Sequence, residues 1–326
     1  MVSASWPRVA VVGAGAVGGY FGGMLARAGA HVTLIGRPVH VDVWTRDGLV
    51  LDSVNFQESI PVAASTEVSA ARDADLVLFS VKSLDTEETA RHLARHVRGD
   101  ALIISLQNGV DNVERMRTAA GLDPIAAAVY VASSMPAPGR VKHRGRGDLL
   151  IGDLPGRPSP PREAAVARVS AWFEAAGVPC RVSEDIEADL WIKLVANAAL
   201  NAISAVAHAT YRDIVAVPDS RETIRQLVNE AVAVARAGGV ALPAVDYAEM
   251  VWRFAEKVGQ VFASTAQDLD RGKRTEIDAL NGFVVRRGAE LGVATPVNQA
   301  LLALVKLREA QPPAAAAFFF RCDQRS

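Results

Sequence analysis

The sequence predicts an α/β domain built on a parallel sheet, followed by a domain made only of helices. Three observations support this fold class. Short β-branched runs alternate with helical patterns through the first half of the 326-residue chain, as in a sheet with helices on both faces. A glycine-rich loop lies between the first such run and the first helical pattern. From about residue 186 the apolar spacing is helical almost continuously to Glu309.

Each expected element has its own local pattern. Strands are predicted where β-branched runs end at glycine or polar residues, over residues 8–12, 31–35, 75–81, 101–106 and 178–182. Helical spacing predicts helices over residues 18–28, 87–96 and 163–176. Between 125 and 152, short apolar runs interrupted by PAPG and RGRG predict antiparallel hairpins. We therefore place the domains at 1–184 and 185–326, and leave open whether the tail 311–326 docks or is disordered.

The composition excludes several classes of protein. The formal net charge is −1 and half of the residues are hydrophobic, so nothing favours nucleic acid or an anionic membrane as a partner. The charge-free stretch from Val9 to Ala26 contains six glycines, and we expect no membrane span there. Cys180 and Cys322 are too far apart to indicate a disulfide framework or a metal site, and they favour a reducing cytoplasm.

Residues 13–18 read GAGAVG, a G-x-G-x-x-G pattern directly after a strand and at the start of a helix. The first glycine permits a tight turn, the second lets a pyrophosphate approach the backbone, and the third lets helix and strand pack closely. The helix N-terminus favours the negative charge of the pyrophosphate. A packing turn without a ligand is the alternative. The loop residues expected to bind the cofactor are Gly13, Ala14, Gly15, Ala16, Val17 and Gly18.

The residues after the second predicted strand indicate which dinucleotide binds. A site for NAD carries Asp or Glu about 20 residues beyond the loop, where it binds the ribose 2′-hydroxyl. Here Ile35 is followed by Gly36 and Arg37, and the next acidic residue is Asp42. A guanidinium binds a 2′-phosphate, which a carboxylate would repel, so NADPH and NADP+ are favoured. The alternative is that Arg37 is an ordinary surface arginine.

The run LWIKLVANAALNAISAVAHA (190–209) places Lys193, Asn197 and Asn201 on one stripe of an otherwise apolar helix. A lysine on a mostly buried helix is costly unless it is paired or lines a wet cavity, so we expect the stripe to line a cleft. A solvated helix face is the alternative. In a cleft, Lys193 could donate a proton to a carbonyl oxygen as hydride reaches the carbon. The asparagines could hydrogen-bond a carboxylate or a hydroxyl.

The segment 264–278, STAQDLDRGKRTEID, is where we expect a partner for Lys193. Its composition does not choose among its four acidic residues, and a solvated helix face is again the alternative. No metal site is expected anywhere. His92 and His96 have the spacing of two zinc ligands on a helix but lack a third ligand.

Several longer motifs occur in a fixed order along the chain. They are VVGAGAVGGYFG (11–22), LFSVKS (78–83), SLQNGVDN (105–112), PGRVKHRGRGDLLIG (138–152), LWIKLVANAALNAISA (190–205), STAQDLDRGKRTEID (264–278) and ATPVN (294–298). Together they resemble the ketopantoate reductase (2-dehydropantoate 2-reductase) family over about residues 8–310. The resemblance implies an N-terminal Rossmann-type dinucleotide-binding domain and an all-α C-terminal domain like that of 6-phosphogluconate dehydrogenase.

The resemblance also implies roles for individual residues. Lys193 is implied to be the catalytic acid, and Glu276 to help bind and orient the lysine and the substrate. The residues implied to hold the 2-oxo acid are Asn108, Asn197, Asn201 and Ser264. Those implied to lie along the cofactor are Lys82, Asn108 and Arg37, the last at the 2′-phosphate.

The expected activity is reduction of 2-dehydropantoate to (R)-pantoate by NADPH in pantothenate and coenzyme A biosynthesis, in a cleft between the domains. One alternative is a sister NADPH-dependent reductase acting on another 2-oxo acid. Another is a non-catalytic NADP(H) sensor, which would need the glycine loop but has no use for Lys193 and Glu276. We expect a cytoplasmic protein whose partner is a small molecule, and we consider a homodimer.

Overall fold

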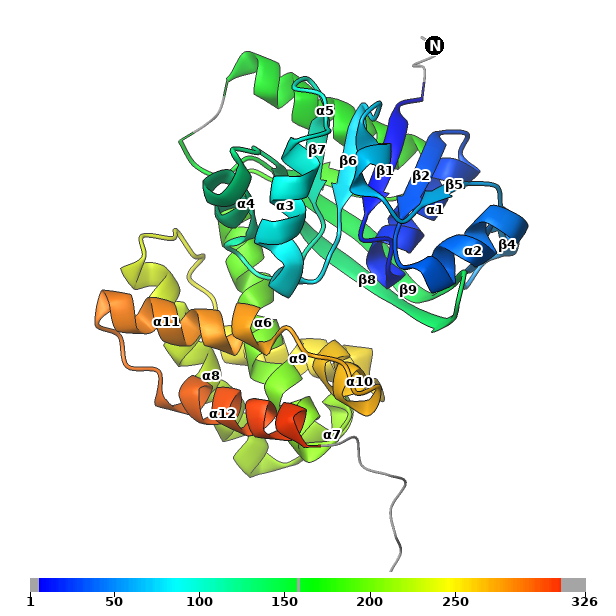
Figure 1. Ribbon diagram of the computed structural model, residues 1–326. Helices are drawn as coiled ribbons and strands as arrows, with labels where there is room; N and C mark the ends of the chain where they lie inside the picture. Colours follow the sequence, from blue (N-terminus) through cyan, green and yellow to red (C-terminus); the bar gives the residue numbers. More distant parts are fainter. Residues whose placement is uncertain (1–5, 157–158, 312–326) are drawn as a thin grey trace, which may run out of the picture. The chain divides into compact units, whose positions relative to one another are not determined.

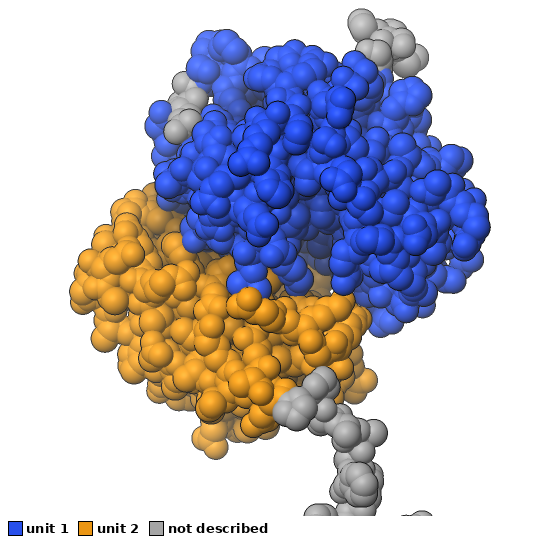
Figure 2. Space-filling view, in the orientation of Figure 1, with its two compact units in different colours: residues 1–190 blue, residues 191–326 orange. Residues whose placement is uncertain are grey.

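The computed structural model describes residues 6–156 and 159–311, and the chain divides into two compact units (Figure 1). Unit 1 comprises residues 1–190 and unit 2 residues 191–326, as coloured in Figure 2. The division falls within helix α6 (Ile186–Ala207). From Pro312 onward, the tail whose order the sequence left open lies outside the described residues.

Unit 1 is built around one mixed sheet. Its strands are β1 (Arg8–Val12), β2 (His31–Ile35), β3 (Leu49–Asp52), β4 (Gln57–Ile60), β5 (Ala63–Ser65), β6 (Leu76–Phe79), β7 (Leu102–Ser105), β8 (Ile125–Ala137), β9 (Arg140–Gly152) and β10 (Cys180–Val182). The strand order is β4-β3-β9-β8-β7-β6-β1-β2-β5, and β10 pairs with β9. From β5 to β8 all neighbours are parallel, whereas β8 and β9 form a long antiparallel hairpin. The parallel sheet and the hairpin predicted over 125–152 are both confirmed.

Helices cover both faces of this sheet. They are α1 (Ala16–Arg27), α2 (Pro38–Asp47), α3 (Thr86–Ala94), α4 (Asn112–Ala120) and α5 (Pro160–Ala175), with the short 3₁₀ turns η1 (Val68–Ala71) and η2 (Ser83–Asp85). Alternate residues of β1 point to opposite sides, as the period of a strand requires. Val9 and Val11 pack with α1 and α5, while Ala10 and Val12 pack with α3 and α4. Burial on both faces explains why this strand has no polar alternation.

Unit 2 contains only helices among its described residues. They are the continuation of α6, then α7 (Tyr211–Ala216), α8 (Pro218–Ala237), α9 (Tyr247–Val258), α10 (Ser264–Asp270), η3 (Ile277–Ala279), α11 (Asn281–Leu291) and α12 (Pro296–Ala310). The almost entirely helical region predicted through Glu309 is therefore confirmed, and its helices are separated by non-helical segments such as residues 238–246 and residues 271–276 after α10. Gly272 lies there with φ +62°, a conformation that ends helices.

Helix α6 is the central apolar helix of this half of the chain. Among the described residues it alone is long and apolar enough to cross a membrane, and 61% of its apolar window is buried inside the protein. A core helix of a water-soluble protein has the same character. Small residues on α6 allow close packing, because Ala202 and Ala205 form a cluster with Ala266, Ile277 and Val305.

Candidate active site

The carboxyl ends of four parallel strands lie in one row in unit 1, where β2, β1, β6 and β7 are side by side (Figure 1). Val12 is paired with Ile35 on one side and with Phe79 on the other. Phe79 is in turn paired with Ser105. Each strand ends within a residue or two of this row, so the four loops that follow emerge at one edge. In open α/β sheets this edge is where ligands bind.

The glycine loop forms the first of these loops, and its glycines differ in what surrounds them. Gly13 has φ +84°, and a Cβ there would lie 2.6 Å from the backbone nitrogen of Val81. A Cβ on Gly18 would lie 2.7 Å from Cγ1 of Val11, in β1. Both findings confirm the predicted tight turn and close helix–strand packing. A Cβ on Gly15 would meet nothing nearer than the Gly13 oxygen at 3.8 Å, so space is open beside the start of α1.

Arg37 follows the second strand and lies close to the glycine loop along the backbone. The N–H groups of Gly13 and Ala14 both donate to the carbonyl of Ile35, at 3.1 and 2.9 Å. Arg37 is two residues beyond that carbonyl, at the N-cap of α2. Arg37 is exposed as a residue, and its guanidinium lies 3.4 Å from the His40 ring. The first turn of α1 contains no acidic residue. The N–H groups of a first helical turn have no partner within the helix, so they can bind an anion.

Lys82 and Asn108 lie in the loops after β6 and β7, and a buried polar network joins these loops. The amide of Gln107, which is 5% exposed, donates to the Val81 carbonyl at 3.1 Å and to the Thr86 hydroxyl at 2.7 Å. The Thr86 hydroxyl also lies 3.0 Å from the Ser83 carbonyl, on the far side of Lys82. The backbone on both sides of Lys82 is therefore fixed by side chains from outside its own loop.

Asn112 and Arg115 complete this network from α4. Asn112 donates to the carbonyl of Asn108 at 2.7 Å, which fixes the turn that carries the predicted asparagine. Arg115 donates to the Ser83 carbonyl at 2.5 Å and forms a two-point ion pair with Glu87 at 2.7 and 2.8 Å. The hydrogen bonds from Arg115 hold the pKa of the Glu87 carboxyl below its ordinary value. Sequence patterns did not single out Gln107, Thr86, Asn112 or Arg115, although Gln107 and Asn112 lie within the motif SLQNGVDN.

The polar stripe of α6 lies in unit 2. Lys193, Asn197 and Asn201 are all within the helix, at the predicted spacing of four residues. Lys193 and Asn197 are half-buried, whereas Asn201 is only 3% exposed. The stripe therefore does not form a solvated helix face. The Tyr211 hydroxyl donates to Oδ1 of Asn201 at 3.2 Å.

Ser264 and Glu276 lie on segments that are both attached to α6. Ser264 begins α10 and is exposed, and the N–H of the residue before it donates to the Ser204 hydroxyl of α6 at 3.1 Å. Glu276 is 8% exposed and precedes Ile277, which packs against α6. Its other neighbour, Thr275, is fixed by the Glu309 carboxylate, which accepts from the Thr275 N–H at 2.7 Å.

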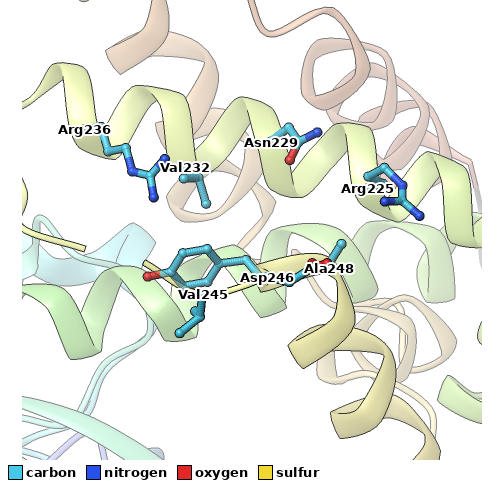
Figure 3. Close-up of a pocket in the computed structure, with 8 residues that line it drawn as sticks. Arg225, Asn229, Val232, Arg236, Val245, Asp246 and Ala248 are labelled. Carbon is cyan, nitrogen blue, oxygen red and sulfur yellow. The ribbon is translucent and has the colours of Figure 1, made fainter. Parts of the chain in front are cut away.

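The expected site residues thus fall into two sets. The loop residues 13–18 lie with Arg37, Lys82 and Asn108 in unit 1, whereas Lys193, Asn197, Asn201, Ser264 and Glu276 lie in unit 2. A cavity of about 270 Å³ also lies in unit 2, but none of these residues lines it. Figure 3 shows Arg225, Asn229 and Arg236 of α8 on one side of this cavity and the start of α9 on the other.

This fold and this arrangement of loops define the class of protein, namely two-domain proteins in which an α/β domain of Rossmann type precedes a helical domain. The model of the family Ketopantoate reductase PanE/ApbA matches residues 9–156, and the model of its C-terminal domain matches residues 185–309. The chain belongs to the ketopantoate reductase family, and it is an oxidoreductase of that family.

Similar proteins match over nearly the full chain. The 2-dehydropantoate 2-reductase of Pyrococcus horikoshii is 32% identical over 305 residues, which cover 93% of this chain and 97% of that protein. The crystal structure of a PanE/ApbA family ketopantoate reductase from Ralstonia eutropha JMP134 is 46% identical, with a TM-score of 0.86. The match covers 93% of this chain and 98% of the Ralstonia eutropha chain.

More distant structures share the fold. A D-mandelate dehydrogenase with NADH and anilino(oxo)acetate is 23% identical, with a TM-score of 0.85 over 93% of this chain and 98% of its own. The dimeric ketopantoate reductase of Staphylococcus aureus is 22% identical, with a TM-score of 0.75 over 93% of this chain and 99% of its own. The two-domain architecture is therefore found in proteins named for different 2-oxo or 2-hydroxy acids.

Proposed function

We propose that the protein is a cytoplasmic 2-dehydropantoate 2-reductase that uses NADPH and supplies (R)-pantoate for pantothenate and coenzyme A biosynthesis. In this proposal the cofactor provides a hydride for C2 of the 2-oxo acid. The side chains provide the proton for the carbonyl oxygen and hold the carboxylate. Reduction of the ketone to an alcohol is then balanced by one hydride and one proton.

The residues in unit 1 fit a dinucleotide. At Gly15 the open space beside the N-terminus of α1 is what a pyrophosphate needs, because a side chain there would fill it. The free N–H groups of the first helical turn would bind its oxygens. Arg37, exposed and two residues beyond the Ile35 carbonyl that anchors the loop, would bind the 2′-phosphate. We propose that Lys82 and Asn108, in neighbouring loops fixed by Gln107 and Asn112, bind farther along the cofactor.

The residues in unit 2 would act on the substrate. Lys193 lies on a half-buried helix face, and its ammonium group would donate the proton to the carbonyl oxygen of the 2-oxo acid. Glu276, which is 8% exposed, would orient Lys193 and the substrate. Asn197, Asn201 and Ser264 would hydrogen-bond the substrate.

One observation carries most of the proposal. A chain of the ketopantoate reductase family has a glycine loop with open space at Gly15, in the same strand-end row as the loops of Lys82 and Asn108. A non-catalytic NADP(H) sensor would need this edge but would have no use for Lys193 and Glu276, and the chain carries both.

A substrate panel tests the proposal. We expect NADPH to be consumed only when a 2-oxo acid is present, with 2-dehydropantoate giving the highest kcat/KM and NADPH preferred over NADH. The fold shared with a D-mandelate dehydrogenase makes reduction of another 2-oxo acid the second candidate. A higher kcat/KM for an aromatic or other branched 2-oxo acid would select that candidate, and absence of turnover with all of them would refute both.

The state of assembly is a separate part of the proposal. We propose a homodimer, as in the dimeric relative from Staphylococcus aureus. Sedimentation equilibrium distinguishes a dimer from the 34.5 kDa monomer.

A further inference from the structure

Asn201 is the most deeply buried residue of the polar stripe, and its two polar atoms have different surroundings. Its Oδ1 accepts a hydrogen bond from the Tyr211 hydroxyl at 3.2 Å. Within the described ranges, 6–156 and 159–311, its Nδ2 has no hydrogen-bond partner. Nδ2 is also not one of the fully enclosed polar atoms that have no hydrogen-bond partner, so it is not completely covered. The amino group of a side chain that is 97% covered therefore retains access to open space.

The Tyr211 hydroxyl decides which end of the carboxamide faces inward. Burial raises the pKa of the Tyr211 phenol to about 12, so the hydroxyl keeps its proton at neutral pH. A buried phenol O–H needs an acceptor, and the Asn201 oxygen is the acceptor that the structure provides. If the carboxamide turned by 180°, two N–H donors would face the hydroxyl and its proton would lose that acceptor. The tyrosine therefore favours the orientation with the amino group outward.

Tyr211 is itself held in place by its local sequence. It is the first residue of α7, and Thr210 before it forms a capping box with Asp213. The Tyr211 N–H donates to the carbonyl of Val261 at 3.0 Å. Its ring also packs on Phe254, with the ring centroids 6.1 Å apart. A capped helix start with contacts on two sides gives the hydroxyl a fixed position.

We infer that Tyr211 is a positioning residue that holds Asn201 as a hydrogen-bond donor toward a carboxylate or carbonyl oxygen of the substrate. The inference rests on the proposed function for the identity of the substrate. Lys193 likewise offers only donors. The two ends of the stripe therefore suit the oxygen-rich, anionic end of a 2-oxo acid.

Tyr211→Phe tests the positioning role, with Tyr247→Phe as the matched control. Tyr247 is also buried in unit 2, but its hydroxyl donates to the Pro243 carbonyl at 2.8 Å, away from the stripe. In Tyr211→Phe we expect the KM for the 2-oxo acid to rise about tenfold, as for one lost hydrogen bond to a charged group. The KM for NADPH should stay unchanged and kcat should change little. Equal KM values in the two variants would overturn the inference.

Asn201→Asp tests the donor role directly. An aspartate keeps the size of the side chain but replaces the donor by a second acceptor with a negative charge. We expect the KM for the 2-oxo acid to rise about a hundredfold, from loss of the donor and repulsion of the carboxylate. A KM within twofold of that of the unmodified protein would show that an acceptor serves equally well, and would overturn the inference.

Failure of the proposed function has a different outcome. The unmodified protein would then reduce no member of the 2-oxo acid panel. The orientation of Asn201 can still be tested without activity, from its side-chain amide resonances in ¹⁵N–¹H spectra. Tyr211→Phe should shift these resonances and Tyr247→Phe should not. An unshifted Asn201 amide in Tyr211→Phe would overturn the positioning role whatever the activity.

Discussion

A methyl group added at Gly13 and one added at Gly15 should have opposite effects, although both glycines belong to the same loop. At Gly13 the backbone has φ +84°, and the new carbon would lie 2.6 Å from the nitrogen of Val81. That neighbour is backbone in a strand-end loop and cannot rotate away. At Gly15 φ is −87°, and the nearest atom is the Gly13 oxygen at 3.8 Å.

The size of each effect follows from this geometry. In Gly13→Ala, the positive φ costs about 1–2 kcal/mol and the overlap with Val81 about 1–3 kcal/mol more. Together these lower the free energy of unfolding by about 2–5 kcal/mol, or the Tm by roughly 4–20 °C for a unit of this size. In Gly15→Ala the stability should stay within about 0.5 kcal/mol. Its methyl would instead occupy the space proposed for the pyrophosphate, so the Kd for NADPH should rise at least about tenfold.

Two measurements on each variant separate these effects. Thermal unfolding followed by circular dichroism gives the Tm, and nucleotide fluorescence gives the Kd for NADPH at a temperature where both variants are folded. Gly15→Ala is the control for Gly13→Ala in the first measurement. An unchanged Kd in Gly15→Ala would refute the loop as the pyrophosphate site. An unchanged Tm in Gly13→Ala would refute the packing against Val81.

Three further predictions concern charged side chains. Lys193→Ala should lower kcat by about 10²–10⁴, the usual contribution of a positioned acid, and wild-type turnover in a stopped-flow assay would exclude that role. Arg37→Met should raise the KM for NADPH about tenfold and leave the KM for NADH unchanged. As a control, Arg46→Met, within the helix that Arg37 precedes, should change neither KM. An equal rise of both KM values in Arg37→Met would contradict 2′-phosphate binding. Because Arg115 lowers the pKa of Glu87, the stability from this pair is fully present above the ordinary glutamate pKa of 4.5 and is lost as the pH falls through the lowered value. Arg115→Met should therefore lose more stability at pH 7 than at about pH 3 in urea unfolding, and an equal loss at both would refute the linkage.

Local patterns were sufficient for the parts of the fold that depend on neighbours in sequence. Strand β1 was predicted to the residue, because a β-branched run that stops at glycine has few other structures. The helix stripe with Lys193 and Asn201 was predicted for the same reason, since helical spacing fixes which residues share a face. Helix α4 had no recognised pattern, and residues 271–276 were expected to continue a helix. A positive φ at Gly272 ends that helix, and composition gave no reason to choose this glycine.

Contacts between distant residues could not be predicted in this way. Gln107 donates to a hydroxyl 21 positions earlier in the chain, and no periodic pattern connects those positions. The partnership of Asn201 with Tyr211 also depends on how α7 turns back after α6. Polarity alone could show that a buried Asn201 needs a hydrogen-bond partner. It could not show which of the two polar atoms of the carboxamide forms that hydrogen bond.

The network around Gln107 constrains how related chains can change. Its side chain holds the Lys82 loop through the Val81 carbonyl, and Asn112 holds the Asn108 turn, so both loops share one set of polar contacts. A substitution at Gln107 alone leaves the Thr86 hydroxyl and a carbonyl without their donor inside the protein. Homologues should therefore exchange Gln107 together with Thr86 and Asn112, or keep all three, and this joint variation should be visible in an alignment even where the surrounding surface has diverged.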